Sequence, residues 1–109
     1  MSRILVAASY HTESYYFNNE NYGSLPPLVV KSLKEIAITF SAKIRGEVII
    51  GFSDEGDVSI TFRALPGEDL NFDEIGAKYH LGKMIETNTE LFGALKVWYA
   101  TVYQLEENI

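Results

Sequence analysis

The chain has 109 residues, the length of a single domain, and 47% of them are hydrophobic, which is enough for a core. It has no cysteine, which excludes disulfides and thiolate metal sites, and its net charge of −6 argues against nonspecific binding to nucleic acid or anionic membranes. No stretch approaches the ~20 apolar residues of a membrane span, and the first apolar run is shorter than a signal-peptide core. We therefore expect one domain over residues 1–109, located in the cytoplasm.

The charged residues are unevenly spread along the chain. Arg63 is the only base between positions 47 and 74, where acidic residues concentrate, whereas bases outnumber acids between positions 25 and 46. Solvated loops and helix faces account for this pattern most simply. A bipolar surface that orients a partner is the alternative interpretation.

Two short strands are predicted near the start of the chain. Residues 3–8 are aliphatic and alternate with polar or small residues, and residues 14–18 have the aromatic content of a second strand. Residues 18–23 are rich in asparagine and end in glycine. Both residue types tolerate left-handed backbone angles, so we expect an irregular loop there.

A helix is predicted next, with Ser24 as its N-cap and Pro26 and Pro27 in its first turn. It should run to about Arg45, and Gly46 should take the left-handed position after its last turn. Apolar residues recur along one arc of this helix and predict its buried face: Val29, Val30, Leu33, Ile36, Ala37, Phe40 and Ile44.

The clearest hairpin in the sequence joins residues 47–53 to residues 57–63, which both alternate between apolar and polar side chains. The three residues between them end in Gly56, which suits the left-handed position of such a turn. This turn pairs Phe52 with Val58 and places both apolar rows on the same side of the sheet.

The start of a second long helix is predicted at Phe72. Asn71 is placed to cap it, and Glu74, three residues later, can reach back to form a capping box. Leu70 and Ile75 have the spacing of a hydrophobic staple around this start.

The rest of this helix carries a wide apolar stripe that begins at Leu81. Ile75 and Tyr79 fall on the opposite side, so a straight helix cannot bury both faces, and we expect a kink or break near Gly82. The full order is strand, strand, helix, strand, strand, helix. It predicts an α+β fold in which two hairpins form an antiparallel four-stranded sheet with two helices packed on one face.

Several short motifs resemble those of an uncharacterised family. The matching stretches are residues 14–18, 25–26, 52–56, 71–76, 90–92 and 98–99, and the most specific is the run FDEIG at residues 72–76. The resemblance covers most of the chain. It implies a small cytosolic protein from clostridial-type bacteria, classed as a domain of unknown function, and it implies no activity.

Catalytic signals in the sequence are weak. His11 and His80 are the only histidines, and one enzyme hypothesis pairs either of them with Glu68, Asp69 or Asp73 for acid–base chemistry. No serine lies in a nucleophile-elbow pattern, and the acidic hairpin turn lacks the ligand spacing of an EF-hand. We therefore expect a non-enzymatic protein without a metal or cofactor.

Two surfaces could bind a partner. Aromatic residues crowd the N-terminal region and could line a groove, since tyrosine combines apolar area with a polar tip: Tyr10, Tyr15, Tyr16, Phe17 and Tyr22. The stripe of the last helix is wider than one sheet face needs, and its margin predicts a homodimer interface: Phe92, Leu95, Trp98, Tyr99, Val102 and Tyr103. The alternative is that the tyrosine-rich N-terminal segment covers this margin within one chain.

These features favour a small protein-interaction or regulatory module that forms a homodimer and binds an unidentified protein, but neither nucleic acid nor membrane. The alternatives are the small enzyme described above, an acidic mimic of nucleic acid, and an acidic chaperone or adaptor. A nucleic-acid mimic would carry carboxylates spaced like phosphates on one surface, and its binding would weaken with salt.

Overall fold

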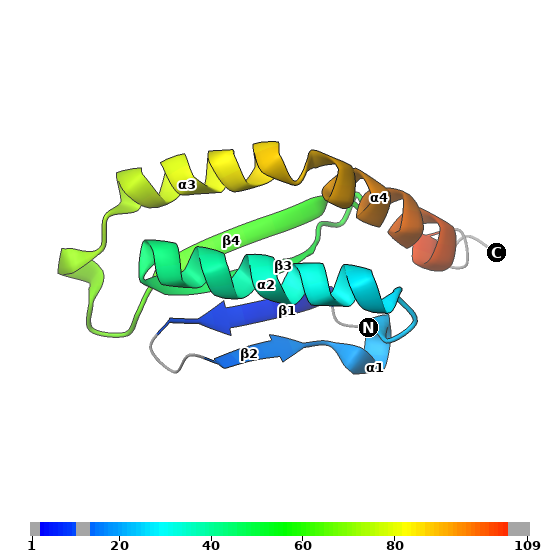
Figure 1. The fold of residues 1–109 in the computed structure, drawn as a ribbon, viewed down its shortest axis with the longest axis horizontal. Helices are drawn as coiled ribbons and strands as arrows, with labels where there is room; N and C mark the ends of the chain where they lie inside the picture. Colours follow the sequence, from blue (N-terminus) through cyan, green and yellow to red (C-terminus); the bar gives the residue numbers. More distant parts are fainter. Residues whose placement is uncertain (1–2, 11–13, 105–109) are drawn as a thin grey trace.

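The computed structural model describes residues 3–10 and 14–104 (Figure 1). Four strands form one antiparallel sheet in the order β2-β1-β3-β4. They are β1 (Ile4–Ser9), β2 (Ser14–Phe17), β3 (Gly46–Phe52) and β4 (Val58–Ala64). The predicted α+β class and the sheet of two antiparallel hairpins are confirmed.

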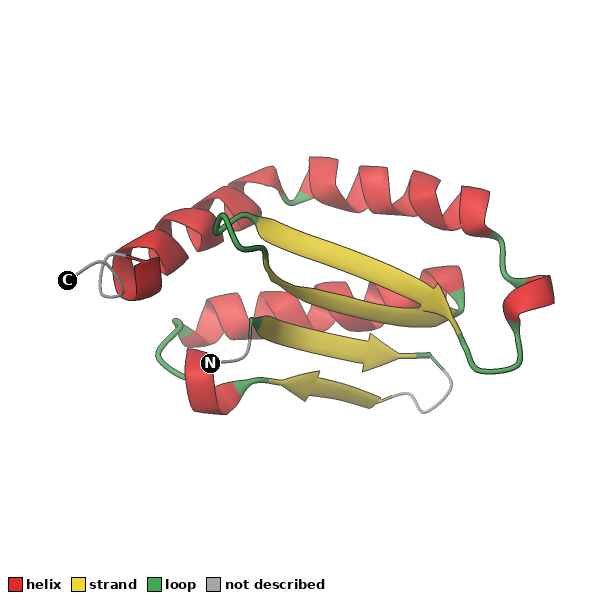
Figure 2. Ribbon diagram, turned by 180° about the vertical axis from the view of Figure 1, so that it is seen from behind, coloured by secondary structure: helices red, strands yellow, loops and turns green. Residues whose placement is uncertain are grey.

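The helices gather on one face of this sheet, and no described helix lies over the other face, which Figure 2 shows in front. They are α1 (Asn19–Tyr22), α2 (Pro27–Ile44), the 3-10 turn η1 (Asp69–Asn71), α3 (Glu74–Thr87), α4 (Thr89–Tyr99) and the π-helical turn η2 (Ala100–Gln104). Helix α2 packs on β1 and β3, α3 packs mainly on α2, and α4 contacts β4. None of these helices is long and apolar enough to cross a membrane.

The β3–β4 hairpin has the predicted register. Phe52 lies opposite Val58, and the pairing continues without a shift to the far end of both strands. Gly56 has a φ of 84°, which is the left-handed angle that the turn requires. The apolar arc of α2 is also confirmed, because its residues are buried or half-buried against the sheet.

The ends of α2 differ from the prediction. Ser24 does not cap the helix, since α2 begins after Pro26 without a side-chain cap. The left-handed residue at its end is Arg45, with a φ of 54°, and not Gly46. Gly46 begins β3 instead, where a Cβ would lie 2.5 Å from the carbonyl oxygen of Arg63. This position therefore needs glycine for space.

The start of α3 also differs. Asp73 is the N-cap, and its carboxylate accepts a hydrogen bond from the N–H of Gly76 at 2.8 Å. Asn71 lies in η1, so the capping box predicted there is wrong. The staple is wrong too, because the Leu70 side chain is 101% exposed and that of Ile75 is 84% exposed.

The predicted break exists, but it lies at Asn88 and not at Gly82. Helix α3 ends at Thr87, and α4 begins at Thr89. The side-chain amide of Asn88 donates to the carbonyl oxygen of Met84 at 2.8 Å, and this bond marks the change of direction. Gly82 lies inside α3 with open space around it.

An aromatic cluster forms the core beneath α4. Tyr22 is fully buried there, with its ring centroid 5.7 Å from that of Phe52 and 6.1 Å from that of Trp98. The ring of Phe52 stacks on that of Tyr99 with the centroids 4.1 Å apart. The hydroxyl of Tyr103 donates a hydrogen bond to the backbone carbonyl of Asn21, which ties α1 to η2.

Burial of Tyr22 should make the protein less stable at high pH. Desolvation raises the pKa of the Tyr22 hydroxyl, and the neighbouring Tyr99 and Tyr103 raise it further. The unfolded chain then loses this proton first, at a pH of about 10, while the folded chain keeps it, so the free energy of unfolding falls as the pH rises above about 10. Chemical denaturation between pH 8 and 11 measures this slope.

Two single substitutions provide the controls for this measurement. Tyr22→Phe removes the buried hydroxyl and should flatten the slope, whereas Tyr16→Phe removes the hydroxyl of an exposed tyrosine on β2 and should keep it. A Tyr22→Phe variant with the full wild-type slope would contradict the assignment.

Candidate functional site

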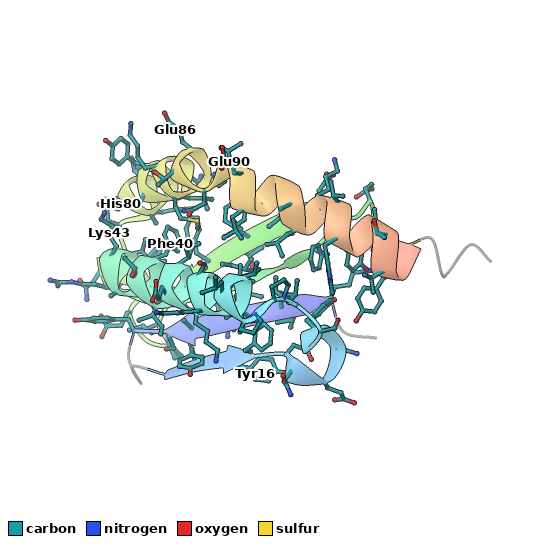
Figure 3. All side chains as sticks on the ribbon, turned by 45° about the vertical axis from the view of Figure 1, so that its right-hand side comes forward. Tyr16, Phe40, Lys43, His80, Glu86 and Glu90 are labelled. Carbon is teal, nitrogen blue, oxygen red and sulfur yellow. The ribbon has the colours of Figure 1, made fainter. Side chains whose placement is uncertain are left out.

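Helices α2 and α3 lie side by side and leave a groove of about 400 Å³ between them (Figure 3). Phe40 and Lys43 point toward it from α2, and His80 points toward it from α3, whereas Glu86 and Glu90 point away. The groove is lined by Ser32, Glu35, Ile36, Thr39, Phe40, Lys43, His80, Lys83, Met84, Thr87 and Asn88.

The floor of the groove is apolar and its rims are polar. Ile36 and Phe40 are four residues apart, so they lie on one side of α2, and Met84 faces them from α3. Phe40 is part of the core, with 3% of its surface exposed, and the other two are half-buried. Thr39 and Lys83 on the rims are exposed. A ligand in this groove would contact apolar side chains below and remain open to water above.

A second hollow, the end hollow, continues the groove at the C-terminal end of α2. It has a volume of about 660 Å³, and Lys43 and His80 line it as well as the groove. Its other lining residues include Tyr10, Arg45 and Phe72, so it joins the end of α2 to the segment before α3.

Three basic side chains, Lys43, Arg45 and Lys83, line the groove and the end hollow together with three carboxylates, Glu35, Glu68 and Asp73. Within residues 3–10 and 14–104, Lys43 and Arg45 have no carboxylate in ion-pair distance, and Lys83 has only Glu86 at 3.9 Å. The C-terminus of α2 favours cations and accounts for part of this arrangement. Lys43 and Arg45 are therefore open to an acidic group, and Glu68 and Asp73 line the same hollow.

The structure places only some of the residues that the enzyme hypothesis pairs. His11 lies outside the described residues. Glu68 and Asp73 line the end hollow together with His80, whereas Asp69 does not. In the described part of the chain, the imidazole of His80 forms no hydrogen bond or ion pair, and its ring lies edge-on to that of Tyr79, with the centroids 5.6 Å apart.

Metal ligands are not clustered in the described residues. Within residues 3–10 and 14–104, no group of three or more histidine, aspartate or glutamate side chains could hold a metal ion. The carboxylate of Asp73 is engaged in capping α3.

The residues predicted to form a dimer interface lie largely inside a single chain. Three of them are buried in its core: Phe92, Leu95 and Tyr99. The other three are half-buried: Trp98, Val102 and Tyr103. The ring of Tyr22 packs against those of Trp98 and Tyr103, so the N-terminal segment covers part of the stripe within one chain and its width does not require a second copy. The homodimer itself stays a prediction.

The five aromatic residues predicted to line one groove are dispersed. Tyr15 and Phe17 face α2, where a lysine ammonium lies 5.1 Å and 5.9 Å from their ring centroids. Tyr16 alternates to the opposite, bare face of the sheet. Tyr22 is in the core, and Tyr10 lines the end hollow.

The geometry defines the class of protein as a two-layer α+β domain with an open groove between its helices. The chain belongs to a family of unknown function, DUF6145, whose family model matches residues 2–108. No curated protein and no solved structure matches the chain. The resemblance to an uncharacterised family is thereby confirmed over nearly the whole sequence.

The groove was not predicted from the sequence, although the apolar side of each of its two helices was. The spacing of Ile36 and Phe40 predicts a buried face, and so does that of Leu81 and Met84. Periodicity shows which side of a helix is apolar, but not which helix lies next to it. The pairing of α2 with α3 depends on tertiary packing.

Proposed function

We propose that this protein is a binding module that holds a helical segment of another protein in the groove between α2 and α3. The groove itself is the observation that carries the proposal, since an apolar floor runs between two neighbouring helices and lies open to solvent along its length. An amphipathic helix laid on such a floor buries one stripe and leaves its polar face in water.

The exposure of the rims favours a peptide over a small molecule. Small-molecule sites usually enclose most of the ligand surface. Here the upper residues of both walls, including Thr39, Lys43 and Thr87, are exposed, so an occupant keeps its outer side in water. A helix needs only one buried face, and a groove between two helices supplies it.

Charge sets the chemistry of the segment. Lys43 and Lys83 line the groove, where Glu35 is the one carboxylate among the described lining residues, while Glu68 and Asp73 line the adjoining end hollow. A segment with acidic residues beside its apolar stripe would pair with the two lysines. The function is accordingly recognition of an acidic amphipathic helix, which is compatible with the adaptor or chaperone role and requires no catalysis.

Peptide selection tests this proposal. A display library of amphipathic helical peptides is selected on the wild-type protein, and the affinity of the enriched peptides is measured by fluorescence anisotropy. Thr39→Trp fills the groove and should weaken binding at least about tenfold, or about 1.4 kcal/mol. Ile38→Trp, a neighbouring exposed position outside the groove, should leave the affinity within about twofold.

The contribution of charge has its own matched pair. Lys43→Glu should weaken binding and select less acidic peptides, whereas Lys31→Glu, on the same helix but outside the groove, should not. Enriched peptides that bind both tryptophan variants equally would place recognition elsewhere and contradict the proposal.

A further inference from the structure

Strand β4 forms a free edge of the sheet and lacks the usual protection of such edges. It has seven residues and pairs with β3 without a bulge. It contains neither proline nor glycine, and its one charged side chain, Arg63, is paired with Glu47. Soluble proteins commonly shorten, bulge or charge their edge strands, because a bare edge invites another strand to pair.

The outward hydrogen-bonding groups of β4 can be assigned. The N–H of Ser53 donates to the carbonyl of Asp57 at 2.8 Å, so these two opposite residues are a hydrogen-bonded pair. Bonded and non-bonded pairs alternate along an antiparallel ladder. Thr61 is therefore bonded to β3, whereas the backbone N–H and C=O of Ile60 and Phe62 point away from β3, toward the free edge.

Helix α3 lies beside this edge and forms what is called the roof below. Figures 1 and 2 both show α3 beyond β4, on the side away from β3. His80 and Met84 face α2, so Leu81 and Ile85, each one position further along, turn about 100° away from the groove. Leu81 is half-buried, in the same apolar cluster as β4, and Ile85 is 43% exposed.

We propose that the β4 edge accepts an extended segment of another protein as a fifth, antiparallel strand. Ile60 and Phe62 would exchange backbone hydrogen bonds with this segment. Every second side chain of the segment would lie between the sheet edge and α3, so those positions should be apolar. A helix or a small molecule cannot supply the alternating donors and acceptors that this edge presents.

A second copy of this chain fits the edge poorly. Pairing β4 with β4 of a second copy places a two-fold axis at the sheet edge and both α3 helices on the same side of the sheet. Because α3 extends beyond β4, the two helices would meet in the same space. The occupant is therefore a strand that carries no such roof.

This surface is separate from the groove, since it lies on the other side of α3, and it goes beyond the proposed function. A negative result at the β4 edge would leave the proposal for the groove unchanged, and the reverse also holds. The variants below lie on β4 or at positions of α3 that do not line the groove.

The test uses a peptide with the sequence of residues 57–65 and a cysteine at position 61. In antiparallel register this sequence is complementary to β4, and position 61 faces position 61 in a non-bonded pair at about 4.5 Å between Cα atoms. That distance permits a disulfide. The native chain has no cysteine, so Thr61→Cys in the protein supplies a single thiol. Mass spectrometry after equilibration in a glutathione buffer measures the cross-linked fraction.

Thr61→Cys should cross-link at least about tenfold more than Ser59→Cys, whose position faces residue 63 of the peptide. N-methylation of the peptide at Ile60 and Phe62 removes the shared hydrogen bonds and should abolish the difference without altering the protein. Ile85→Lys in the roof should reduce cross-linking, whereas Tyr79→Lys, on the outer side of α3, should not.

Three results would overturn the inference. Equal cross-linking at positions 59 and 61, or none at either, would show that β4 does not add a strand in this register. Insensitivity to N-methylation would show that backbone pairing is not involved. A Thr61→Cys protein that links to itself in preference to the peptide would make a second copy the occupant.

Discussion

Phe52→Ala is expected to lower the free energy of unfolding by about 3–5 kcal/mol, the usual loss for a large aromatic side chain removed from a core. Phe52 is 5% exposed, and its ring stacks on that of Tyr99 and contacts that of Tyr22. Its removal leaves a cavity at the point where β3, α4 and the N-terminal loop meet. For a domain of this size the melting temperature should fall on the order of 15–25 °C.

Tyr16→Ala is the matched control, because it removes an aromatic side chain that is 55% exposed on the edge strand β2. Its effect should be within about 0.5 kcal/mol. Equal losses for both variants in thermal denaturation would contradict the aromatic core described beneath α4.

Gly51→Ala is the second substitution with a large expected effect. Gly51 lies opposite Ile4, next to the irregularity in the β1–β3 pairing. A Cβ at this position would lie 2.3 Å from the carbonyl oxygen of Arg3, which itself accepts a hydrogen bond from the N–H of Phe52. The backbone of β1 would have to move, with an expected loss of about 2–3 kcal/mol.

The opposite sign is expected for Gly82→Ala. A Cβ at Gly82 meets nothing within 4 Å, and alanine is better than glycine inside a helix by up to about 1 kcal/mol. Urea denaturation of both variants gives the comparison. A neutral Gly51→Ala, or a destabilising Gly82→Ala, would contradict the packing around β1 or the continuity of α3.

The features predicted correctly are those whose structure depends on a short stretch of sequence. The β3–β4 hairpin was predicted in full, because its register follows from the turn around Gly56 and from two matched apolar rows. The buried face of α2 followed in the same way from its period. In both cases the information lies within a short stretch of sequence.

Two of the wrong predictions concern the roles of glycine residues. Glycine is the usual left-handed residue after a helix, yet Arg45 has that angle and Gly46 is needed because β4 passes too close for a Cβ. Gly82 suggested a kink through its low helix propensity. The helix instead changes direction at Asn88, from which α4 continues to the aromatic core. Neither outcome is visible in a local window.

The candidate site was the least predictable feature. The wide stripe of the last helix suggested a dimer, but Tyr22 packs against Trp98 and Tyr103 of the same chain. Tyr99 is buried, with its ring stacked on that of Phe52. The groove instead lies between α2 and α3, which are separated in sequence by the whole β3–β4 hairpin. A single helix pattern cannot show which exposed margin will find a partner inside its own chain.

Helix α3 emerges as the element on which both proposed surfaces depend. Ala77 is its only buried residue, and it packs mainly on α2. One of its sides faces the groove, and another faces the free edge of β4. Leu81 and Met84 are partly buried against the core, and the rest of α3 is largely exposed.

The most direct test of the groove is a titration of the isotopically labelled protein with an enriched helical peptide, followed by backbone amide spectra. The largest chemical-shift changes are expected on the residues lining the groove, including Ile36, Phe40, His80 and Met84. The bare face of the sheet, around Ile49 and Thr61, should change little. Shifts concentrated on that face, with none along α2 and α3, would contradict the proposal.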